Sequence, residues 1–303
     1  MTDQRMSLLV WAEMALLALI WGGSFLAIRT ALDEIPVLAS VTHRVLWAAL
    51  ILWAIVLIRR LPLPRSPRVW GAFLIMGFLN NVIPFSLMAW GQLTIETGLT
   101  AILNAATAIW GVLVAAIFFK DERLTWTRTT GVLLGFAGVA VAIGVQNLAT
   151  FDLRSLAQLA VIAGTLSYAL AGSWARATLG AQPPIVAAAG MLTGSTLVMI
   201  PLTFAIEGGL PMRMDATTWV AIAYYAVAST ALAYLLYYRI LATSGAGNLL
   251  LVTLMIPPVA IVLGVLVRGE AIPAQAYLGF GLLALGLLLL DGRLFHRQSA
   301  QGD

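Results

Sequence analysis

Residues 7–28 read SLLVWAEMALLALIWGGSFLAI, and Glu13 is the only charged side chain in this run. An α-helix of about 20 apolar residues crosses the ~30 Å hydrocarbon core of a bilayer. Arg5 precedes the run, as in a signal peptide, but no small-residue cleavage site ends it. We therefore interpret the run as a retained transmembrane helix.

The whole sequence has the composition of a membrane protein. Of the 303 residues, 61% are hydrophobic and 10% are charged, whereas an ordinary soluble domain is about 25% charged. Apolar runs long enough to span a membrane alternate with short polar joints. We predict an all-α membrane protein of ten transmembrane helices, over residues 7–28, 37–58, 69–91, 99–119, 127–145, 156–174, 185–206, 217–238, 247–267 and 273–290.

The basic residues predict how these helices are oriented. The joints on the side of the two termini carry twelve Lys and Arg residues, and the joints on the other side carry four. Cytoplasmic loops of membrane proteins hold the excess of Lys and Arg. Both termini are therefore expected in the cytoplasm, and the net charge of +4 reflects topology rather than a nucleic-acid partner.

The sequence also contains an internal repeat. A shift of 147 residues places five apolar runs on five others. Because each repeat has an odd number of spans, the two repeats are inverted, an arrangement typical of secondary transporters with a site near the midplane. We expect repeats over residues 7–145 and 156–291 around a central cavity. The superposed pairs are Trp21 with Tyr168, Arg29 with Arg176, Pro36 with Pro183 and Gly98 with Gly245.

Three stretches resemble the EamA-type branch of the drug/metabolite transporter superfamily: ALIWGGSFLAIR (18–29), HRVLWAALIL (43–52) and KDERLTWTRTTGVLLGFAGVAVA (120–142). The second half repeats the last of these as RGEAIPAQAYLGFGLLALGLLLL (268–290). The chain looks most like ten-helix exporters of the bacterial inner membrane, which carry amino acids and related metabolites and include aromatic amino acid exporters. It departs from an even repeat at Met191, which stands at the position equivalent to Arg44.

Polar and aromatic side chains inside the runs are the candidates for substrate contact. Thr100, Asn104, Thr107 and Gly111 share one face of a helix, which either bonds a neighbouring helix or lines a cavity. With no Arg or Lys cluster to bind phosphate, the cavity suits zwitterions with apolar or aromatic side chains. The predicted substrate-binding residues are Trp21, Ser24, Asn80, Asn81, Asn104, Thr107, Trp110, Ser167, Tyr168, Tyr234 and Asn248.

Two ionisable residues inside the second run are predicted as structural or gate residues. Arg44 and its neighbour His43 lie about two turns into the helix, where a charge costs ~2.5–3.5 kcal/mol on insertion scales. Arg44 either has a structural role, in a salt bridge or by snorkelling to the membrane interface, or acts as a gate or as a contact for a substrate carboxylate. The salt-bridge partners that the sequence offers are Asp33, Glu34 and Glu96.

Prolines and glycines predict bends and close packing. Pro84, Pro257 and Pro258 are expected to kink their helices at mid-depth. The fifth helix carries a GxxxG motif at 131–135, and the tenth is studded with glycines. We expect these two helices to pack closely, within the chain or in a possible homodimer.

An intramembrane enzyme and a membrane scaffold are the alternatives to a transporter. The sequence has no H-E-x-x-H or G-x-S-x-G motif, no cysteine, and only His43 and His296 as histidines. A scaffold would not need an aligned polar face. We therefore predict a solute transporter without metal or cofactor, whose partners are a small-molecule substrate and the lipid bilayer.

Overall fold

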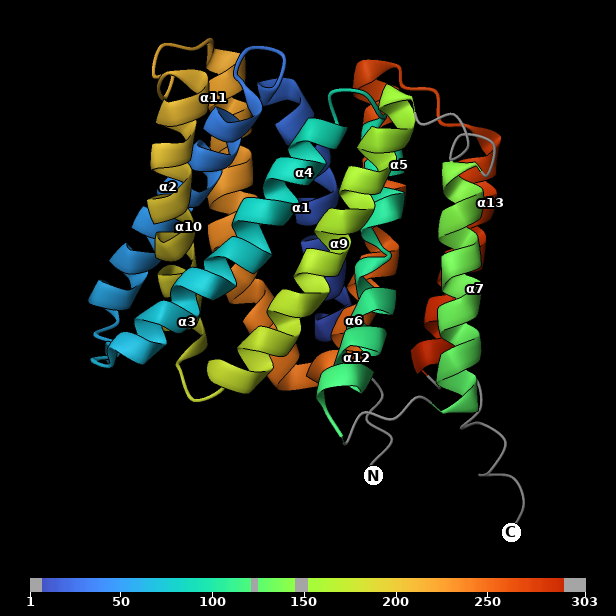
Figure 1. Ribbon diagram of the computed structural model, residues 1–303, viewed down its shortest axis with the longest axis horizontal. Helices are drawn as coiled ribbons and strands as arrows, with labels where there is room; N and C mark the ends of the chain where they lie inside the picture. Colours follow the sequence, from blue (N-terminus) through green and yellow to red (C-terminus); the bar gives the residue numbers. More distant parts are fainter. Residues whose placement is uncertain (1–6, 121–124, 145–151, 292–303) are drawn as a thin grey trace.

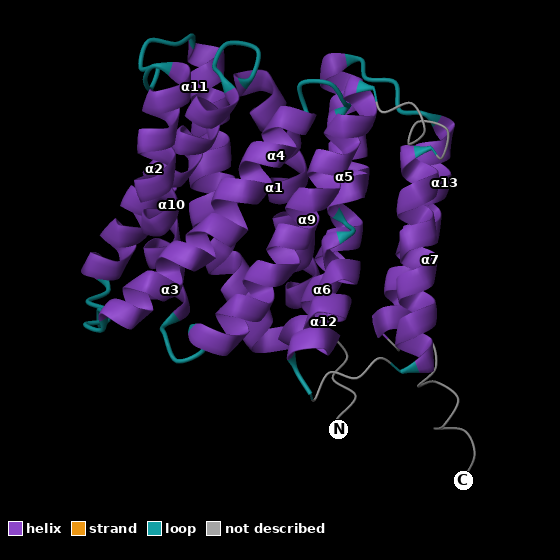
Figure 2. Cartoon of the chain, in the orientation of Figure 1, coloured by secondary structure: helices purple, strands orange, loops and turns teal. Residues whose placement is uncertain are grey.

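The computed structural model describes residues 7–120, 125–144 and 152–291, and within these ranges every regular element is a helix (Figures 1 and 2). Nine helices in the described part are long and apolar enough to cross a membrane, and Ala274–Leu290 is a shorter apolar tenth. The prediction of an all-α, multi-pass membrane protein is confirmed. In Figure 1 the helices stand side by side, with α7 and α13 as a pair at one edge.

The helices follow the predicted spans closely. In chain order they are α1 (Leu8–Ala31), α2 (Val37–Ile58), α3 (Pro67–Gly77), η1 (Phe78–Val82), α4 (Ile83–Gly91), α5 (Thr97–Asn104), α6 (Thr107–Phe118), α7 (Trp126–Ile143), α9 (Leu153–Thr178), α10 (Pro184–Glu207), α11 (Ala216–Ala223), η2 (Tyr224–Leu232), α12 (Ala233–Arg268) and α13 (Ala274–Asp291). The elements η1 and η2 are π-helices.

Two of the predicted spans differ from the structure in backbone detail. The fourth span is interrupted between α5 and α6, where the N–H groups of Ala105 and Ala106 bond three residues back instead of four. The joint expected between residues 238 and 247 is helical, because α12 continues through it. A helical joint satisfies its own backbone groups at the edge of the membrane. Helix α12 also continues past Pro257 and Pro258, so these prolines do not end it.

The two π-helices lie in equivalent spans. Residues 78–82 of η1, shifted by 147, fall on 225–229, which lies inside η2 (224–232). The internal repeat therefore extends to the backbone conformation itself. A π-helical turn holds one residue more than an α-helical turn and is frequent at functional sites.

In the first half, η1 leaves the Leu79 carbonyl without a backbone donor. The N–H of Ile83 bonds back to the Phe78 carbonyl, and the next residue, Pro84, has no N–H to offer Leu79. The hydroxyl of Ser167 in α9 donates to this carbonyl at 2.6 Å. Pro84 is thus accommodated by a π-helix and by a side chain from the other half.

The second half repeats this arrangement with different residues. The N–H of Ala233 bonds the carbonyls of Ala228 and Thr230, and not that of Ser229, which lies between them. The indole N–H of Trp21 in α1 donates to it at 3.1 Å. The first span therefore serves the eighth and the sixth serves the third, as an inverted repeat requires.

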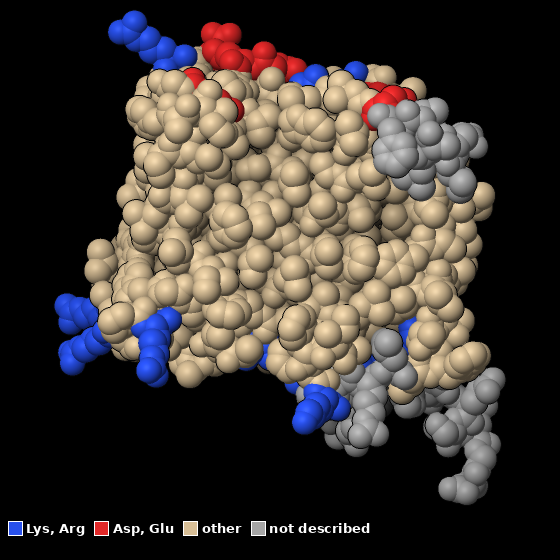
Figure 3. Space-filling model, in the orientation of Figure 1, with Lys and Arg blue, Asp and Glu red and all other residues tan. Residues whose placement is uncertain are grey.

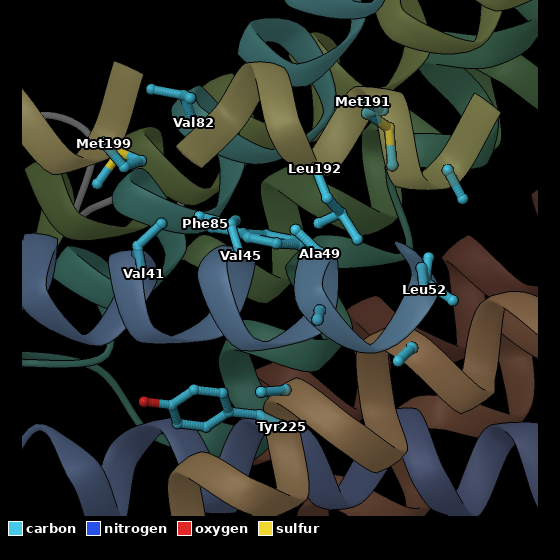
Figure 4. Packing of buried hydrophobic residues seen from close by; sticks show 14 of the residues in the cluster. Val41, Val45, Ala49, Leu52, Val82, Phe85, Met191, Leu192, Met199 and Tyr225 are labelled. Carbon is cyan, nitrogen blue, oxygen red and sulfur yellow. The ribbon is translucent and has the colours of Figure 1, made fainter. Parts of the chain in front are cut away.

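Apolar packing between α2 and α10, which are equivalent helices, forms a core shared by both halves. Val45, Leu52 and Leu192 are fully buried there. Figure 4 shows the α2 side chains directed toward Met191 and Leu192 of α10, with Tyr225 on the other side of α2. The two halves are therefore joined through one continuous hydrophobic cluster.

Glycines hold α7 and α13 in contact, as the motif in the fifth helix predicted. A Cβ on Gly138 would lie 2.7 Å from the Gly279 carbonyl oxygen, and one on Gly131 would lie 2.8 Å from that of Gly286. Backbones that approach this closely leave room only for glycine. These glycine faces are occupied within the chain, and the homodimer through the same helices stays a prediction.

Replacing Gly138 with Ala should lower the melting temperature of the purified protein. The added methyl group would lie 2.7 Å from the Gly279 carbonyl, whereas a Cβ on Gly281 of the same helix pair meets nothing within 4 Å. Gly281→Ala is the matched control and should leave stability unchanged or raise it by up to about 1 kcal/mol, because Ala favours helix. Equal melting temperatures for the two variants would contradict the close packing of α7 on α13.

Candidate functional site

The side chain of Arg44 extends from α2 toward η2 and α4. Its Nε donates to the Thr230 hydroxyl at 2.9 Å, and its guanidinium carbon lies 3.8 Å from the centre of the Phe85 ring. The Thr230 hydroxyl donates in turn to the Tyr225 carbonyl five residues back, at 2.7 Å. Thr230 is thereby oriented as an acceptor for Arg44, and the π-helical turn is what places it there.

No carboxylate lies within salt-bridge distance of Arg44 in the described part of the chain. The salt-bridge alternative for Arg44 is not found there, because its three proposed partners lie beyond helix ends and bond elsewhere. Asp33 pairs with Arg29 and Arg268, Glu96 pairs with Arg154, and Glu34 accepts from the start of α11. The guanidinium instead has the phenol groups of Tyr168 and Tyr234 within electrostatic reach.

Asn80 and Asn81 occupy η1, which directs these neighbours to different helices. The Asn81 amide donates to Ser195 of α10 at 2.7 Å, and the Asn80 amide donates to Tyr234 of α12 at 3.1 Å. The two asparagines are also joined to each other at 3.1 Å. We call this chain of bonds, from Ser195 to Tyr234, the amide relay.

The Arg44 cluster is defined here as Arg44, Asn80, Phe85, Tyr168, Thr230 and Tyr234. Tyr168 packs edge-on to Phe85 with ring centres 6.4 Å apart, and it also contacts the second hydrophobic core around α5 and α6. Sequence reasoning missed Phe85 and Thr230. A hydroxyl in the middle of the eighth span was a usable signal for Thr230, whereas nothing marks Phe85 among the other aromatic residues.

Other predicted residues lie outside this cluster. Trp21 packs against Tyr237 with ring centres 5.9 Å apart, and Trp110 packs edge-on to Phe136 of α7 at 4.7 Å. The Asn104 amide oxygen and the Trp110 indole nitrogen are buried without a hydrogen-bond partner in the described residues. Asn104 ends α5 and Trp110 lies in the first turn of α6, so the two lie on either side of the break between these helices.

Three predicted hydroxyls donate to backbone carbonyls. Ser24 donates to Trp21 at 2.6 Å, Thr107 donates to Asn104 at 2.8 Å, and Ser167 serves Leu79 as described above. These bonds give the hydroxyls a structural role in or between helices. The side chain of Asn248 lies outside the described residues.

The model of the EamA-like transporter family matches the chain twice, over residues 9–144 and 155–290. The chain belongs to this family. It is a membrane transporter rather than an enzyme, as the sequence predicted.

Known proteins resemble this EamA-like transporter along nearly its whole length. A "Probable terminal-alkyne amino-acid exporter" of Streptantibioticus cattleyicolor is 27% identical over 299 residues and covers 97% of both chains. The "Uncharacterized inner membrane transporter YedA" of Escherichia coli is 23% identical and covers 94% of this chain and 92% of its own. One crystal structure, 18% identical, superposes with a TM-score of 0.67, covers 95% of this chain and 98% of that chain, and shows the same fold.

Charged side chains divide the two ends of this EamA-like transporter. In Figure 3 the Asp and Glu side chains gather along the upper edge, together with a few Lys and Arg, while the lower edge shows Lys and Arg alone. We call the upper end the acidic face. It is the end where α1 finishes and α2 starts, and its carboxylates include Asp33, Glu34, Glu96, Glu207 and Glu270.

Carboxylates from the second half cap two helices of the first half at the acidic face. The α2 N-terminus receives no bond from its own cap residue; Glu207 accepts from the backbone N–H groups of Leu38 and Ala39, both at 2.8 Å. Glu270 accepts from the N–H of Thr97 in α5 at 3.0 Å and from its hydroxyl at 2.6 Å. Helix N-termini have unpaired N–H groups and a positive dipole end, so they bind carboxylates well.

A carboxylate of the first half caps the second half in the same way. Glu34 accepts from the N–H of Asp215, the N-cap residue of α11, at 3.0 Å and from the hydroxyl of Thr218 in the first turn of that helix. The ion pair of Arg268 with Asp33, at 2.8 Å, also joins the halves. The hydrogen bond from Arg268 and the nearby charge of Arg29 hold the pKa of the Asp33 carboxyl below its ordinary value. This pair therefore persists well below neutral pH.

His43 is fully engaged in hydrogen bonds. Its Nδ1 accepts from the Trp47 indole N–H at 3.1 Å, so Nε2 carries the proton and donates to the Pro211 carbonyl at 2.8 Å. The ring is fully buried and packs edge-on to Trp219. These bonds require the neutral imidazole, which makes His43 a structural link between α2 and the segment before α11.

Substituting His43→Gln should therefore affect stability rather than transport. We expect a melting temperature several degrees lower, because loss of one buried hydrogen bond costs about 1–2 kcal/mol. Transport per folded molecule, and its dependence on pH between about 5.5 and 8, should match the unsubstituted protein. If the pH dependence of transport differs between the variant and the unsubstituted protein, His43 takes part in proton movement instead.

Proposed function

We propose that this transporter exports amino acids or related metabolites, and that Arg44 binds the substrate carboxylate. The observation that carries the proposal is the guanidinium of Arg44, which has no anionic partner in the described residues. Among the residues that the structure describes, Thr230 is the acceptor of its Nε–H, and the terminal N–H groups have none. The terminal N–H groups present the geometry that holds a carboxylate in two parallel hydrogen bonds.

Aromatic rings around Arg44 support an apolar or aromatic substrate side chain. Phe85 lies against the guanidinium, Tyr168 packs edge-on to Phe85, and Tyr234 lies four residues after Thr230, which accepts from Arg44. The ring of Tyr234 packs against Tyr238, with ring centres 6.4 Å apart, and Tyr238 packs against Tyr237, with ring centres 5.3 Å apart. The S. cattleyicolor relative, described as a probable exporter of an amino acid, supports both the substrate class and the direction of transport.

Alternating access between the inverted halves is the proposed mechanism. The substrate binds at the Arg44 cluster, and the carboxylate caps and the Arg268–Asp33 ion pair, which join the halves at the acidic face, keep that face closed. In the opposite access state the halves separate there. The excess of Lys and Arg at the other face supports an inner-membrane orientation with both termini in the cytoplasm.

Replacing Arg44 with Met, the residue at the equivalent position of the second half, should abolish carboxylate binding. In proteoliposomes the kcat/KM for a labelled amino acid should fall at least ~10-fold, as expected for loss of a charge-assisted hydrogen bond. Arg44→Lys keeps the charge but not the forked geometry, so its kcat/KM should lie between those of the unsubstituted protein and Arg44→Met. Arg239→Met is the matched control, because Arg239 is exposed and pairs with Glu13 away from the cluster. Unchanged transport by Arg44→Met at normal folded yield would refute the proposal.

Weakening a cap at the acidic face should open that face. Because the chain has no cysteine, Ala31→Cys supplies a single thiol at a fully buried position near the end of α1. Adding Glu207→Gln should raise labelling by a membrane-impermeant maleimide severalfold in intact cells, since an amide places N–H groups against the start of α2.

The control for this experiment is Glu13→Gln in the same Ala31→Cys background. Glu13 pairs with Arg239 at the other face, so its loss should not expose the thiol to reagent outside the cell. An equal rise in both variants would show general loosening of the fold, and no rise in Glu207→Gln would remove the cap from the closing mechanism.

A further inference from the structure

The amide relay permits only one direction of hydrogen bonding at Ser195. The Ser195 hydroxyl lies 2.9 Å from the Met191 carbonyl oxygen and 3.2 Å from that of Gly77. Carbonyl oxygens only accept, so the single proton of Ser195 is committed to them. The Ser195 oxygen can therefore only accept from Asn81, and the NH₂ group of Asn81 must face it.

The orientation of the Asn81 amide also fixes the orientation of the Asn80 amide. With its NH₂ directed at Ser195, Asn81 offers its oxygen to Asn80, which must therefore donate. The second N–H of Asn80 donates to the Tyr234 hydroxyl. Both amide protons of Asn80 are thus used, and its Oδ1 is a fixed acceptor without a hydrogen bond from any described residue.

The relay also leaves the phenol proton of Tyr234 available. Tyr234 accepts from Asn80 and donates to no described group, and it lies within electrostatic reach of Arg44. Beside the fixed cation of Arg44 there is consequently one neutral donor, Tyr234, and one neutral acceptor, Asn80. None of the six residues of the Arg44 cluster carries a negative charge.

We propose that Asn80 is a specificity-determining residue, whose amide oxygen accepts from the ammonium group of a substrate whose carboxylate binds Arg44 and Tyr234. This inference rests on the proposed function and names the substrate class more narrowly, as α-amino acids in preference to simple carboxylic acids. Neutrality of the acceptor is essential. A carboxylate at this position would pair with Arg44 and compete with the substrate.

Two ligands that differ only in the ammonium group test this inference. Uptake of labelled L-phenylalanine and 3-phenylpropionate is compared in proteoliposomes containing the full-length protein. The unsubstituted protein should prefer phenylalanine. Asn80→Leu should raise the KM for phenylalanine ~10-fold or more, the effect expected for one charge-assisted hydrogen bond, and leave the KM for phenylpropionate nearly unchanged.

A nearly isosteric variant, Asn80→Asp, cannot make the two bonds that Asn80 donates to Asn81 and Tyr234, and it should weaken transport of both ligands, because its carboxylate neutralises Arg44. Thr193→Val is the control; Thr193 bonds Trp53 between α2 and α10, outside the Arg44 cluster, and its loss should preserve the preference. If Asn80→Leu yields too little folded protein, the Asn80→Asp result decides, and undiminished phenylalanine transport there overturns the inference.

The outcomes distinguish failure of this inference about Asn80 from failure of the proposed function. An equal loss for both ligands in Asn80→Leu, or a preserved preference, would show that Asn80 only holds helices together. Failure of the unsubstituted protein to transport either ligand would instead overturn the proposed function.

Discussion

Hydrocarbon offers no hydrogen bond, so every backbone group that leaves regular helical bonding must find a partner inside the protein. In this transporter the partners come from the opposite half. Ser167 serves the Leu79 carbonyl at one π-helix, and Trp21 serves the Ser229 carbonyl at the other. At the membrane surface Glu207 does the same for the N–H groups at the start of α2. Irregular backbone in one half is thereby tied to side chains of the other.

The depth of these bonds decides which of them can break during transport. Bonds at the acidic face can be exchanged for bonds to water, because that face borders the aqueous phase. The bonds at the π-helices lie at mid-depth, where a freed carbonyl costs several kcal/mol. We therefore expect the halves to part at the face and to pivot about the mid-depth bonds and the apolar contact of α2 with α10.

Arg44 is the exception to this pattern of mutual satisfaction. Its charge is shielded by Phe85 and held by Thr230, yet no carboxylate neutralises it within the described residues. Its equivalent in the second half is Met191, which is buried in the apolar core. The two halves therefore differ at the one position that supplies a fixed charge to the Arg44 cluster. The substrate carboxylate that we propose would neutralise this charge.

The sequence by itself determined the membrane class, the spans and the inverted repeat, because apolar length and the spacing of residues such as Trp21 and Tyr168 are properties of the chain alone. It also singled out Arg44, since a charge within an apolar run is conspicuous. Only the tertiary structure decided what Arg44 bonds to, because Thr230 and Phe85 come from distant spans. The same holds for the caps at the acidic face and for the orientation of Asn80, which depends on Ser195 in another helix. Hydrophobic length is local, whereas the partner of a polar group is fixed by which helices pack together.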